Sequence, residues 1–505
     1  MTTTKEEREF KLTVPFDWDV PTHRLAPFSL GDERVVGLTA TYFDTADLRL
    51  ARSGASLRYR EPEGWTAKLP SLRGRLMKRT EVTVVGPQTA PVPPQLLDVL
   101  TAFTRGAPVR PIATLHTERR ARVVRDDRGR PVAELTDDLV DAAPIGDFMV
   151  DVRQFRELEV ELTEDASEKS GRRIARGLRE AGADDGDPRS KIVRALGSRA
   201  QQPADLTEPP TVDSHSDVAT LVTAAIRGSI RALVAHDAQI RMGDDPDDVH
   251  DARVAVRRLR ADLRTFGPVL RSADLGPVIA DLRWLGAALG EVRDADVLSA
   301  SIVAASVGLP EIDQIESLAL QHQLADERRA AYQRLLSVLR SSEYLTLLDQ
   351  LIVLAASPPV RRKLAGRPAT DEVLRLVQRP WKRLNRMVSE LPTEPDDASL
   401  HAVRIAAKRA RYAAEAVAPV AGRDARRLAR QLAKLQGILG DHHDAVLGRS
   451  WLTTVSTVGS ADGYSAFVAG EIAHALLMRQ ESIASTWRAR WDKVEARNPH
   501  HWHVS

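Results

Sequence analysis

The chain has 505 residues, 43% of them hydrophobic and 28% charged, a composition typical of folded globular proteins and a length that suggests two to four domains. It contains no cysteine, which excludes disulfide frameworks and thiolate metal sites and agrees with a cytoplasmic location. The sequence shows neither a signal-peptide pattern nor an apolar run long enough for a membrane span, so we expect neither secretion by a standard signal nor a membrane-spanning helix. Lys and Arg (72) nearly balance Asp and Glu (70), so partners must be inferred from local charge clusters.

Residues 1 to about 165 contain short segments of alternating apolar and polar side chains, which predict β-strands. The first segment, Glu7-Arg8-Glu9-Phe10-Lys11, places Glu7, Glu9 and Lys11 on one strand face. A hairpin is expected at Asp127-Arg128-Gly129, and helices at about 92–104 and 165–182. These segments predict an antiparallel barrel or sandwich. The other strands are expected at Leu12–Val14, Leu57–Arg60, Thr66–Leu69, Glu81–Val85, Arg120–Val124, Val132–Leu135 and Phe155–Leu162.

Charged side chains recur on one face of several predicted strands. Arg58 shares a face with Arg60. Glu157 shares a face with Glu159 and Glu161. One such strand would indicate a solvent-exposed face, but the repetition favours a barrel with a charged lumen that holds a metal ion and an anion. The other charged residues expected in the lumen are Lys68, Lys78, Arg79, Glu118, Arg120 and Arg122.

The pattern changes after a polar, proline-containing segment. We expect a first domain over residues 1–200, a linker over 201–215 and a helical domain over 216–497. The helical domain is expected to consist of two repeats, at about 216–355 and 369–495. Its helices are predicted at about 216–240, 247–266, 275–303, 311–355, 369–391, 398–418, 423–452 and 464–495.

The two repeats are visible as matching segments. His250–Arg260 matches His401–Arg411, and further downstream Leu289–Ala295 matches Leu439–Ala445. The downstream segment of each repeat carries a glycine in a helical context. A glycine there lowers helix stability by about 1 kcal/mol relative to alanine. A close helix crossing would explain this. The two glycines are Gly290 and Gly440.

Each repeat also places basic side chains three and four residues apart, on a single helical stripe. Like charges on one face repel, and bound multivalent phosphate would offset this repulsion through charge-assisted hydrogen bonds. The alternatives are a solvated basic face and pairing with acidic residues such as Asp294 and Asp444. Tyr412 is a lone aromatic, so we expect no nucleic-acid partner. The stripe residues are His250, Arg253, Arg257, Arg260, Arg264, His401, Arg404, Lys408 and Arg411.

The N-terminal half resembles the CYTH superfamily, the triphosphate tunnel metalloenzymes. The C-terminal half resembles the CHAD domain through its paired His-x-x-Arg helices and Leu-Gly-x-x-x-Asp segments. The combination is similar to bacterial two-domain CYTH–CHAD proteins. The CYTH resemblance rests on Glu-x-Glu-x-Lys at Glu7, Glu9 and Lys11 and on the segments Tyr42–Thr45, Leu57–Arg60, Trp65–Lys68, Arg79–Glu81, Arg119–Arg122 and Glu157–Glu161.

The resemblance implies an α+β multidomain fold, with an eight-stranded antiparallel β tunnel followed by an all-α duplicated helical bundle. It implies that Glu7, Glu9 and Lys11 are catalytic and that carboxylates hold Mg²⁺ or Mn²⁺. The doublets Lys78-Arg79 and Arg119-Arg120 leave open which member faces the tunnel, although strand parity favours Arg120 with Arg122. The implied metal ligands are Glu7, Glu9, Asp138, Glu157, Glu159 and Glu161. The implied phosphate contacts are Lys11, Arg58, Arg60, Lys68, Arg79, Arg120 and Arg122.

The resemblance further implies metal-dependent hydrolysis of inorganic triphosphate, with inorganic polyphosphate bound by the basic stripes of the helical domain. Two alternatives remain open. The tunnel could act on an organic triphosphate, as a thiamine triphosphatase or an adenylate cyclase does, or both halves could bind polyphosphate without catalysis. The expected location is cytoplasmic, association with polyphosphate granules is left open, and no membrane partner is expected.

Overall fold

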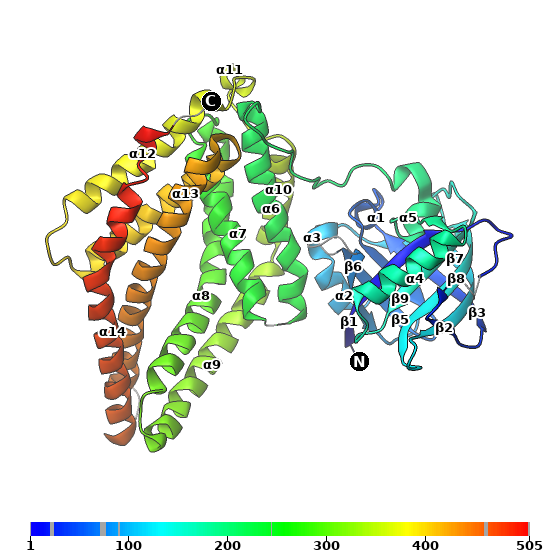
Figure 1. Ribbon diagram of the computed structural model, residues 1–505, viewed down its shortest axis with the longest axis horizontal. Helices are drawn as coiled ribbons and strands as arrows, with labels where there is room; N and C mark the ends of the chain where they lie inside the picture. The colour runs from blue at the N-terminus through cyan, green and yellow to red at the C-terminus, as the bar shows by residue number, and fades with distance from the viewer. Residues whose placement is uncertain are drawn as a thin grey trace. The chain divides into compact units, whose positions relative to one another are not determined.

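A computed structural model describes residues 2–20, 25–70, 77–88, 91–243, 245–458 and 463–502. The side chains of residues 2, 5–7, 77–79, 272, 457, 458 and 501 lie outside the described part. The chain forms two compact units, Met1–Thr207 and Glu208–Ser505, and each unit is described by itself. The first unit is built around strands and the second is built from helices (Figure 1).

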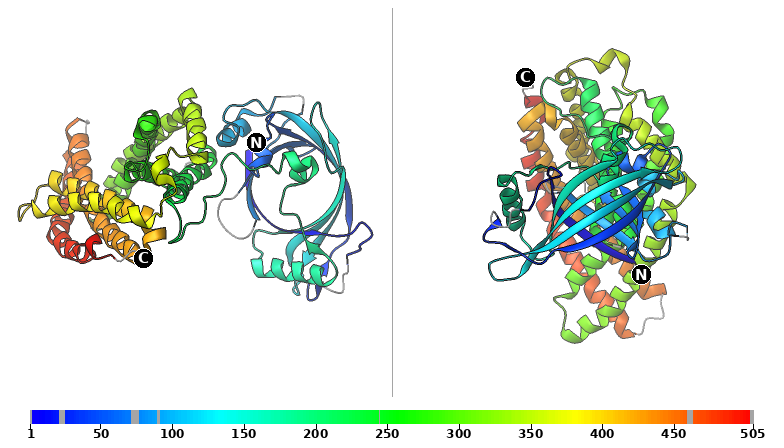
Figure 2. Two further views of the ribbon diagram at one scale, coloured as in Figure 1. Left: turned by 90° about the horizontal axis from the view of Figure 1, so that it is seen from above. Right: turned by 90° about the vertical axis from the view of Figure 1, so that its right-hand side faces the viewer.

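The first unit is built on an antiparallel sheet that curves round on itself. Its strands pair in the order β10-β1-β6-β5-β4-β3-β7-β8-β9, and β9 pairs again with β1. Among the described residues, eight of these strands therefore surround a central tunnel (Figure 2, left), which confirms the predicted antiparallel tunnel fold. The strands are β1 (Thr2–Thr13), β2 (Ser29–Leu30), β3 (Arg34–Asp44), β4 (Ser56–Arg60), β5 (Gly64–Pro70), β6 (Met77–Val84), β7 (Arg110–Arg125), β8 (Pro131–Pro144), β9 (Gln154–Leu162) and β10 (Asp184–Asp185).

Two apolar clusters hold the tunnel in place. The helix α4 (Glu168–Glu180) packs on β1, β8 and β9, where Ile174 and Leu178 are buried. A second cluster includes Ile192 and Leu196 of α5 (Lys191–Leu196), which pack with buried residues of the strands. This packing anchors α5, and the first residue of α5 faces the tunnel cavity. The other helical segments of this unit are α1 (Arg49–Arg52), α2 (Pro94–Val99), α3 (Thr101–Thr104) and η2 (Gly197–Arg199).

The strands agree only partly with the sequence predictions. The predicted hairpin is present, because an Asp126 Oδ1 atom accepts hydrogen bonds from the backbone amides of Arg128 and Arg130 at 3.0 and 2.9 Å, and Gly129 has a φ of 76°. The strand β3 was not predicted from alternation. It lines the tunnel with Leu38, Ala40 and Tyr42, which alternate with Thr39 and Thr41. The alternation is therefore present, but this face carries no charge and gave no signal of a charged lumen.

The second unit is helical, as predicted. The expected helix over 311–355 is two helices, since Ser341 begins a new one by accepting a hydrogen bond from the Tyr344 amide at 3.2 Å. The segments expected at 398–418 and 423–452 are two helices that meet at a kink, where Gly422 has a non-helical φ of 69°, and together they span Asp397–Val458. The helices are α6 (Val218–Met242), α7 (Pro246–Thr265), η3 (Ser272–Leu275), α8 (Gly276–Ser306), α9 (Glu311–Leu339), α10 (Ser342–Ala356), α11 (Arg362–Ala365), α12 (Thr370–Ser389), α13 (Asp397–Val458), α14 (Gly463–Glu495) and η4 (Pro499–His501).

One described helix, α6, is long and apolar enough by length and composition to cross a membrane. It packs against α7 and α10. Leu221, Ile226 and Ile230 are among its buried residues. These contacts are those of a core helix within the bundle.

Candidate functional site

The tunnel encloses a cavity of about 310 Å³ that is lined mainly by charged and polar side chains. Its lining comes from strands on all sides of the tunnel and from α5. Because side chains alternate between the two faces of a strand, the lining takes every second residue of each strand. The charged lining residues are Glu9, Lys11, Arg58, Arg60, Glu63, Lys68, Glu81, Arg119, Asp138, Glu159, Glu161 and Lys191.

The acidic wall is formed where β1 lies beside β9. In this register Glu9 is opposite Glu161, and Lys11 is opposite Glu159. Lys11 Nζ donates hydrogen bonds to Glu157 Oε1 at 2.9 Å and to Glu159 Oε1 at 2.8 Å. Burial alone would lower the pKa of Lys11, but the carboxylates of Glu159, Glu157 and Glu9 outweigh it and raise the pKa above its usual value. The ammonium group therefore stays charged at neutral pH.

Two further cations face the same wall: Lys191, which the sequence predictions missed, and Arg119, which they left open as the alternative to Arg120. Lys191 Nζ lies 2.7 Å from Glu159 Oε1 and 3.0 Å from Glu157 Oε1. Arg119 donates to both carboxylate oxygens of Asp138, at 2.8 and 2.6 Å. Despite burial, Glu159 and its acidic neighbours raise the pKa of Lys191 well above its usual value. Only the packing of α5 places Lys191 here, so no sequence signal would have identified it.

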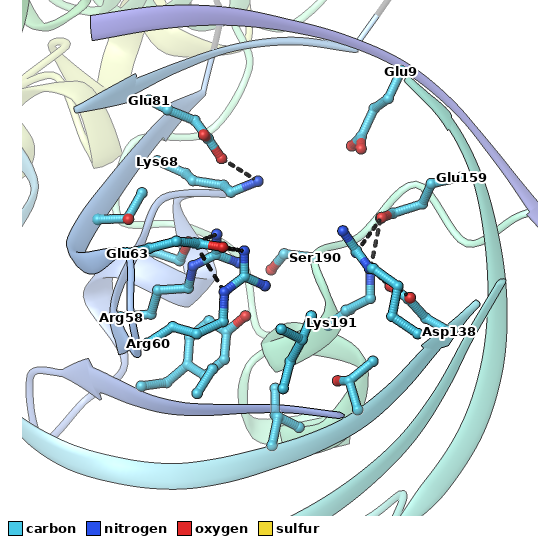
Figure 3. Close-up of a pocket in the computed structure, with 18 of the residues that line it drawn as sticks. Glu9, Arg58, Arg60, Glu63, Lys68, Glu81, Asp138, Glu159, Ser190 and Lys191 are labelled. Atoms are coloured by element: carbon cyan, nitrogen blue, oxygen red, sulfur yellow. Dashed lines mark hydrogen bonds and ion pairs between the residues drawn. The ribbon is translucent and has the colours of Figure 1, made fainter. Parts of the chain in front are cut away.

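The basic wall lies across the cavity from the acidic one (Figure 3). Arg60 donates to Glu63 at 2.9 Å through Nε and at 2.5 Å through Nη2. Arg58 Nη2 lies 3.5 Å from the same carboxylate, and Lys68 forms an ion pair with Glu81. Glu63, in the turn between β4 and β5, and Glu81 were not predicted as site residues. Each therefore places a carboxylate against a cation that was predicted to bind phosphate.

The donor chemistry of the acidic wall fits a hard divalent cation. Glu9, Glu159 and Glu161 present only carboxylate oxygens to the cavity, and no histidine lines it among the described residues. Oxygen ligands of this kind suit Mg²⁺ and Mn²⁺. In addition, Glu157 Oε2 is buried without a hydrogen-bond partner. In the described part of the chain, no group of three or more such side chains is arranged to hold a metal ion. Lys11, Arg119 and Lys191 form ion pairs with carboxylates of this wall.

The prediction that Arg120 and Arg122 line the tunnel is wrong. Arg120 Nη2 pairs with Glu118 at 3.0 Å, and its side chain is 51% exposed. Arg122 pairs with Glu33 at 2.7 Å. Neither lines the cavity, whereas Arg119 does. Strand parity groups residues by face, but it does not say which face points inward.

Three other predicted residues, Glu7, Arg79 and Glu157, are not among the described residues that line the cavity. Glu157 lies on the same face of β9 as Glu159, but it is fully buried and does not line the cavity; it contacts Lys11 and Lys191. The side chains of Glu7 and Arg79 lie outside the described part. Their backbones are paired across β1 and β6.

Six of the nine predicted stripe residues line one cavity in the helical unit, which we call the helical cavity. Its volume is about 870 Å³. Burial, followed by the nearby charges of Arg404, Arg257 and Arg253, lowers the pKa of Lys408 to about 7. The crowding of cations therefore already penalises the protonated lysine. The six residues are His250, Arg253, Arg257, His401, Arg404 and Lys408.

The helical cavity also contains acidic and histidine side chains. Arg253 Nη1 pairs with Asp294 Oδ1 at 2.9 Å, which is the alternative pairing considered from the sequence. His443, which was not predicted, lies with Nδ1 3.1 Å from Nδ1 of His401. Burial, together with His401 and the nearby cations, lowers the pKa of His443 to about 4. Both rings are therefore neutral near pH 7.

The sequence suggested that the two glycines of the repeat mark a close helix crossing, but the structure does not show this. A Cβ atom on Gly290 would lie 3.8 Å from Arg253, and one on Gly440 would lie 3.7 Å from Arg404. These are ordinary contact distances, so neither position requires the absence of a side chain. The glycines instead lie beneath equivalent arginines of the two repeats.

The remaining three stripe residues lie elsewhere. Arg411 Nε donates to Glu415 at 2.8 Å. Arg260 and Arg264 line a smaller hollow of about 230 Å³ together with Arg283. These three residues therefore do not line the helical cavity with the other six, and their predicted role in polyphosphate binding stays a prediction.

Comparisons with known proteins identify both units. The CYTH domain family matches residues 5–190, and the CHAD domain family matches residues 224–453. The uncharacterized proteins MT2285 and Rv2226 of two Mycobacterium tuberculosis strains are each 32% identical over 467 residues, covering 88% of this chain and 86% of theirs. The chain belongs to the two-domain CYTH–CHAD proteins.

Two solved structures are also similar to parts of the chain. PptA from Streptomyces chartreusis is 21% identical and covers 55% of this chain and 100% of its own, with a TM-score of 0.48. The CHAD domain from the plant Ricinus communis is 24% identical and covers 59% of this chain and 96% of its own, with a TM-score of 0.44.

Proposed function

We propose that the tunnel unit hydrolyses inorganic triphosphate to diphosphate and phosphate, and that the helical unit binds inorganic polyphosphate. The observation that supports the first part is a single cavity with a carboxylate wall facing a cationic wall (Figure 3). A triphosphate needs both walls, because its charge must be neutralised and a metal ion must be held beside it.

The basic wall supplies the phosphate contacts. Triphosphate carries roughly four to five negative charges near neutral pH. Arg58, Arg60 and Lys68 lie together on adjacent strands β4 and β5. Guanidinium groups bind phosphate oxygens through paired hydrogen bonds. Bound phosphate would replace the carboxylates of Glu63 and Glu81, which neutralise these cations in the free protein.

The acidic wall supplies the metal ligands. Glu9, Glu159 and Glu161, with Glu7 and Asp138, would hold Mg²⁺ or Mn²⁺. When bound, the metal would neutralise phosphate charge and polarise the attacking water. Lys11, Arg119 and Lys191 lie on the same wall, where their charges would help to neutralise the bound phosphate.

The chemistry requires no covalent nucleophile. Phosphoryl transfer depends mainly on positioning and on stabilising charge in the transition state. The cationic wall would hold the chain of phosphates while carboxylate oxygens orient water toward the terminal phosphorus. No cysteine is present, and no histidine lines the described cavity, so the carboxylates are the candidates for accepting a proton from water.

A substrate panel tests this assignment against its alternatives. Inorganic triphosphate, thiamine triphosphate and ATP would be offered to the intact protein with each metal, and the products would be identified. We expect phosphate release that is fastest from inorganic triphosphate. Cyclic AMP formed from ATP would favour a cyclase, whereas binding of polyphosphate without turnover of any substrate would favour a non-catalytic protein.

The proposal for the helical unit rests on the helical cavity, where cations from equivalent positions of both repeats converge. A linear phosphate chain could satisfy Arg257, Arg404 and Lys408 together. The measurement is binding of long-chain inorganic polyphosphate to the intact protein. Arg257→Gln combined with Arg404→Gln should weaken it, and equal binding by duplex DNA would contradict the assignment.

A further inference from the structure

A second basic hollow in the helical unit is lined by arginine from several separate segments. Its volume is about 930 Å³, and it shares no lining residue with the helical cavity. We call it the arginine hollow. No aspartate, glutamate or aromatic side chain lines it among the described residues. Its arginines are Arg264 from α7, Arg361 before α11, Arg375, Arg379, Arg383 and Arg386 from α12, and Arg409 from α13.

The α12 arginines form a stripe that was not identified from the sequence. They are spaced three or four residues apart and so share one face of the helix. Val377, Trp381 and Leu384 are buried, so the apolar face of α12 packs into the bundle. Like charges on one face destabilise an isolated helix, and this stripe lies at a hollow where arginines from other segments face it.

Acidic partners are scarce at this surface. Arg375 has Glu372 at 3.3 Å, and Arg386 has Glu390 at 3.9 Å. In the described part of the chain, Arg264, Arg379, Arg383 and Arg409 form no ion pair with a carboxylate. Burial, and then the charges of Arg409, Arg260 and Arg283, lower the pKa of Arg264. The arrangement therefore leaves several guanidinium groups available to an anion.

The hollow is held by the fold and does not consist of loose surface side chains alone. Arg361 Nε donates to the Leu270 carbonyl at 3.0 Å, and its backbone amide donates to Val269 at 2.9 Å. These contacts attach the segment before α11 to the turn that follows α7. Pro268 in that turn and Pro380 in α12 also line the hollow.

We infer that the arginine hollow is a second binding site for linear inorganic polyphosphate. Guanidinium groups bind phosphate oxygens in paired geometry, and seven of them suit a ligand with closely spaced phosphates. Single-stranded nucleic acid fits less well, because its binding sites generally offer aromatic side chains for base stacking. The inference rests on the proposed polyphosphate function and adds a second site at which the protein binds the polyphosphate chain.

The two sites lie along the same helices. On α7, Arg257 lines the helical cavity and Arg264 lines the arginine hollow, seven residues or about 10 Å farther along the helix. On α13, Lys408 lines the first site and its neighbour Arg409 lines the second. A sufficiently long phosphate chain would therefore reach both, and long chains should bind more tightly than short ones.

The test uses the intact protein and calorimetric titration with short and long linear inorganic polyphosphate. The variant Arg379→Gln with Arg383→Gln removes two cations of the hollow. The matched control, Arg329→Gln with Lys382→Gln, removes two exposed cations that line neither site. We expect the first variant to weaken binding of long chains by at least about tenfold and the control to change it less than about twofold.

The outcomes separate this inference from the proposed function. If Arg257→Gln with Arg404→Gln weakens binding while the α12 variant matches its control, the arginine hollow is not a polyphosphate site. If the wild-type protein binds no polyphosphate, both proposals fail. A single-stranded oligonucleotide that binds the wild-type protein as tightly as polyphosphate, and loses that affinity in the α12 variant, would also overturn the assignment. Unchanged circular dichroism of the variants, and partial recovery with Arg379→Lys and Arg383→Lys, would support it.

Discussion

Glu63 places a carboxylate between two arginines that the proposed reaction needs for phosphate. Arg60 contacts it through two nitrogens, and Arg58 lies at 3.5 Å. The Glu63 side chain is 41% exposed, so it can turn toward solvent when an anion enters. In the free protein this carboxylate would compete with substrate for the same guanidinium groups.

Removing that competition should strengthen substrate binding. We expect Glu63→Gln to lower the KM for triphosphate severalfold while kcat changes little, because a neutral amide competes less well for the arginines. Steady-state kinetics would measure both constants. Glu61→Gln, in the same turn, is the matched control. A higher KM in Glu63→Gln would show that the carboxylate positions the arginines and does not block them.

Lys408 gives the helical cavity a pH dependence in the neutral range. Its pKa of about 7 reflects burial and the charges of Arg404, Arg257 and Arg253, with Asp444 acting in the opposite direction. Bound phosphate would raise this pKa, so the complex holds more protons on Lys408 than the free protein does. Affinity linked to Lys408 is therefore greatest below pH 7 and declines as the pH rises through 7.

The variant Lys408→Arg isolates this effect, because arginine stays protonated at all the pH values concerned. We expect polyphosphate affinity in the wild-type protein to fall between pH 6.5 and 9, and to change less in the variant. Burial and neighbouring cations lower the pKa values of His250, His401 and His443 below their usual value in the free protein. Equal slopes in both proteins would exclude Lys408 as the titrating group.

Two helical glycines differ in whether the packing around them leaves room for a side chain. A Cβ atom on Gly171 of α4 would lie 2.4 Å from the ring of Phe10 and 2.9 Å from Leu162, so the helix depends on a close approach to β1 and β9. A Cβ atom on Gly440 of α13 would meet Arg404 only at 3.7 Å. The same substitution should therefore change stability in opposite directions.

We expect Gly171→Ala to lower the free energy of unfolding of the tunnel unit by about 1–3 kcal/mol through overpacking. Gly440→Ala should raise that of the helical unit by up to about 1 kcal/mol through helix propensity. Calorimetric unfolding of the intact protein would measure both. A stabilised Gly171→Ala variant would mean that α4 is not packed closely on the sheet.

Sequence patterns predicted where helices and strands lie better than they predicted which face of a strand points into the tunnel. The helical segments were found because apolar residues recur at helical spacing over long stretches. Alternation grouped Arg120 with Arg122 correctly but could not tell the inner from the outer face, which only the closure of the sheet decides. The strand β3 was not predicted, although Leu38, Ala40 and Tyr42 of its tunnel face alternate with Thr39 and Thr41. Lys191 was missed because tertiary packing alone brings it to the acidic wall.

At the scale of the whole molecule, two compact units carry two kinds of charged cavity. In the tunnel unit, a wall rich in carboxylates faces a wall rich in cations, and each wall also carries oppositely charged partners. The helical unit gathers cations at two cavities, of which only the helical cavity has acidic side chains among its described lining residues. The net charge of +2 conceals this division. The local motifs predicted both chemistries, but the arginine hollow required the fold, because its residues come from segments scattered over the sequence from Arg264 to Arg409.

In the proposed function, the carboxylates of the tunnel hold the metal ion on which triphosphate hydrolysis depends. The most direct measurement is phosphate release from inorganic triphosphate by the intact protein, with Mg²⁺, with Mn²⁺ and with the metal removed by a chelator. The key variant is Glu7→Gln with Glu9→Gln, and Glu118→Gln on the outer face of β7 is its control. We predict that phosphate release requires the metal and falls by at least about 100-fold in the double variant. It should be unchanged in the control variant. Wild-type rates in the double variant would contradict the assignment of these carboxylates.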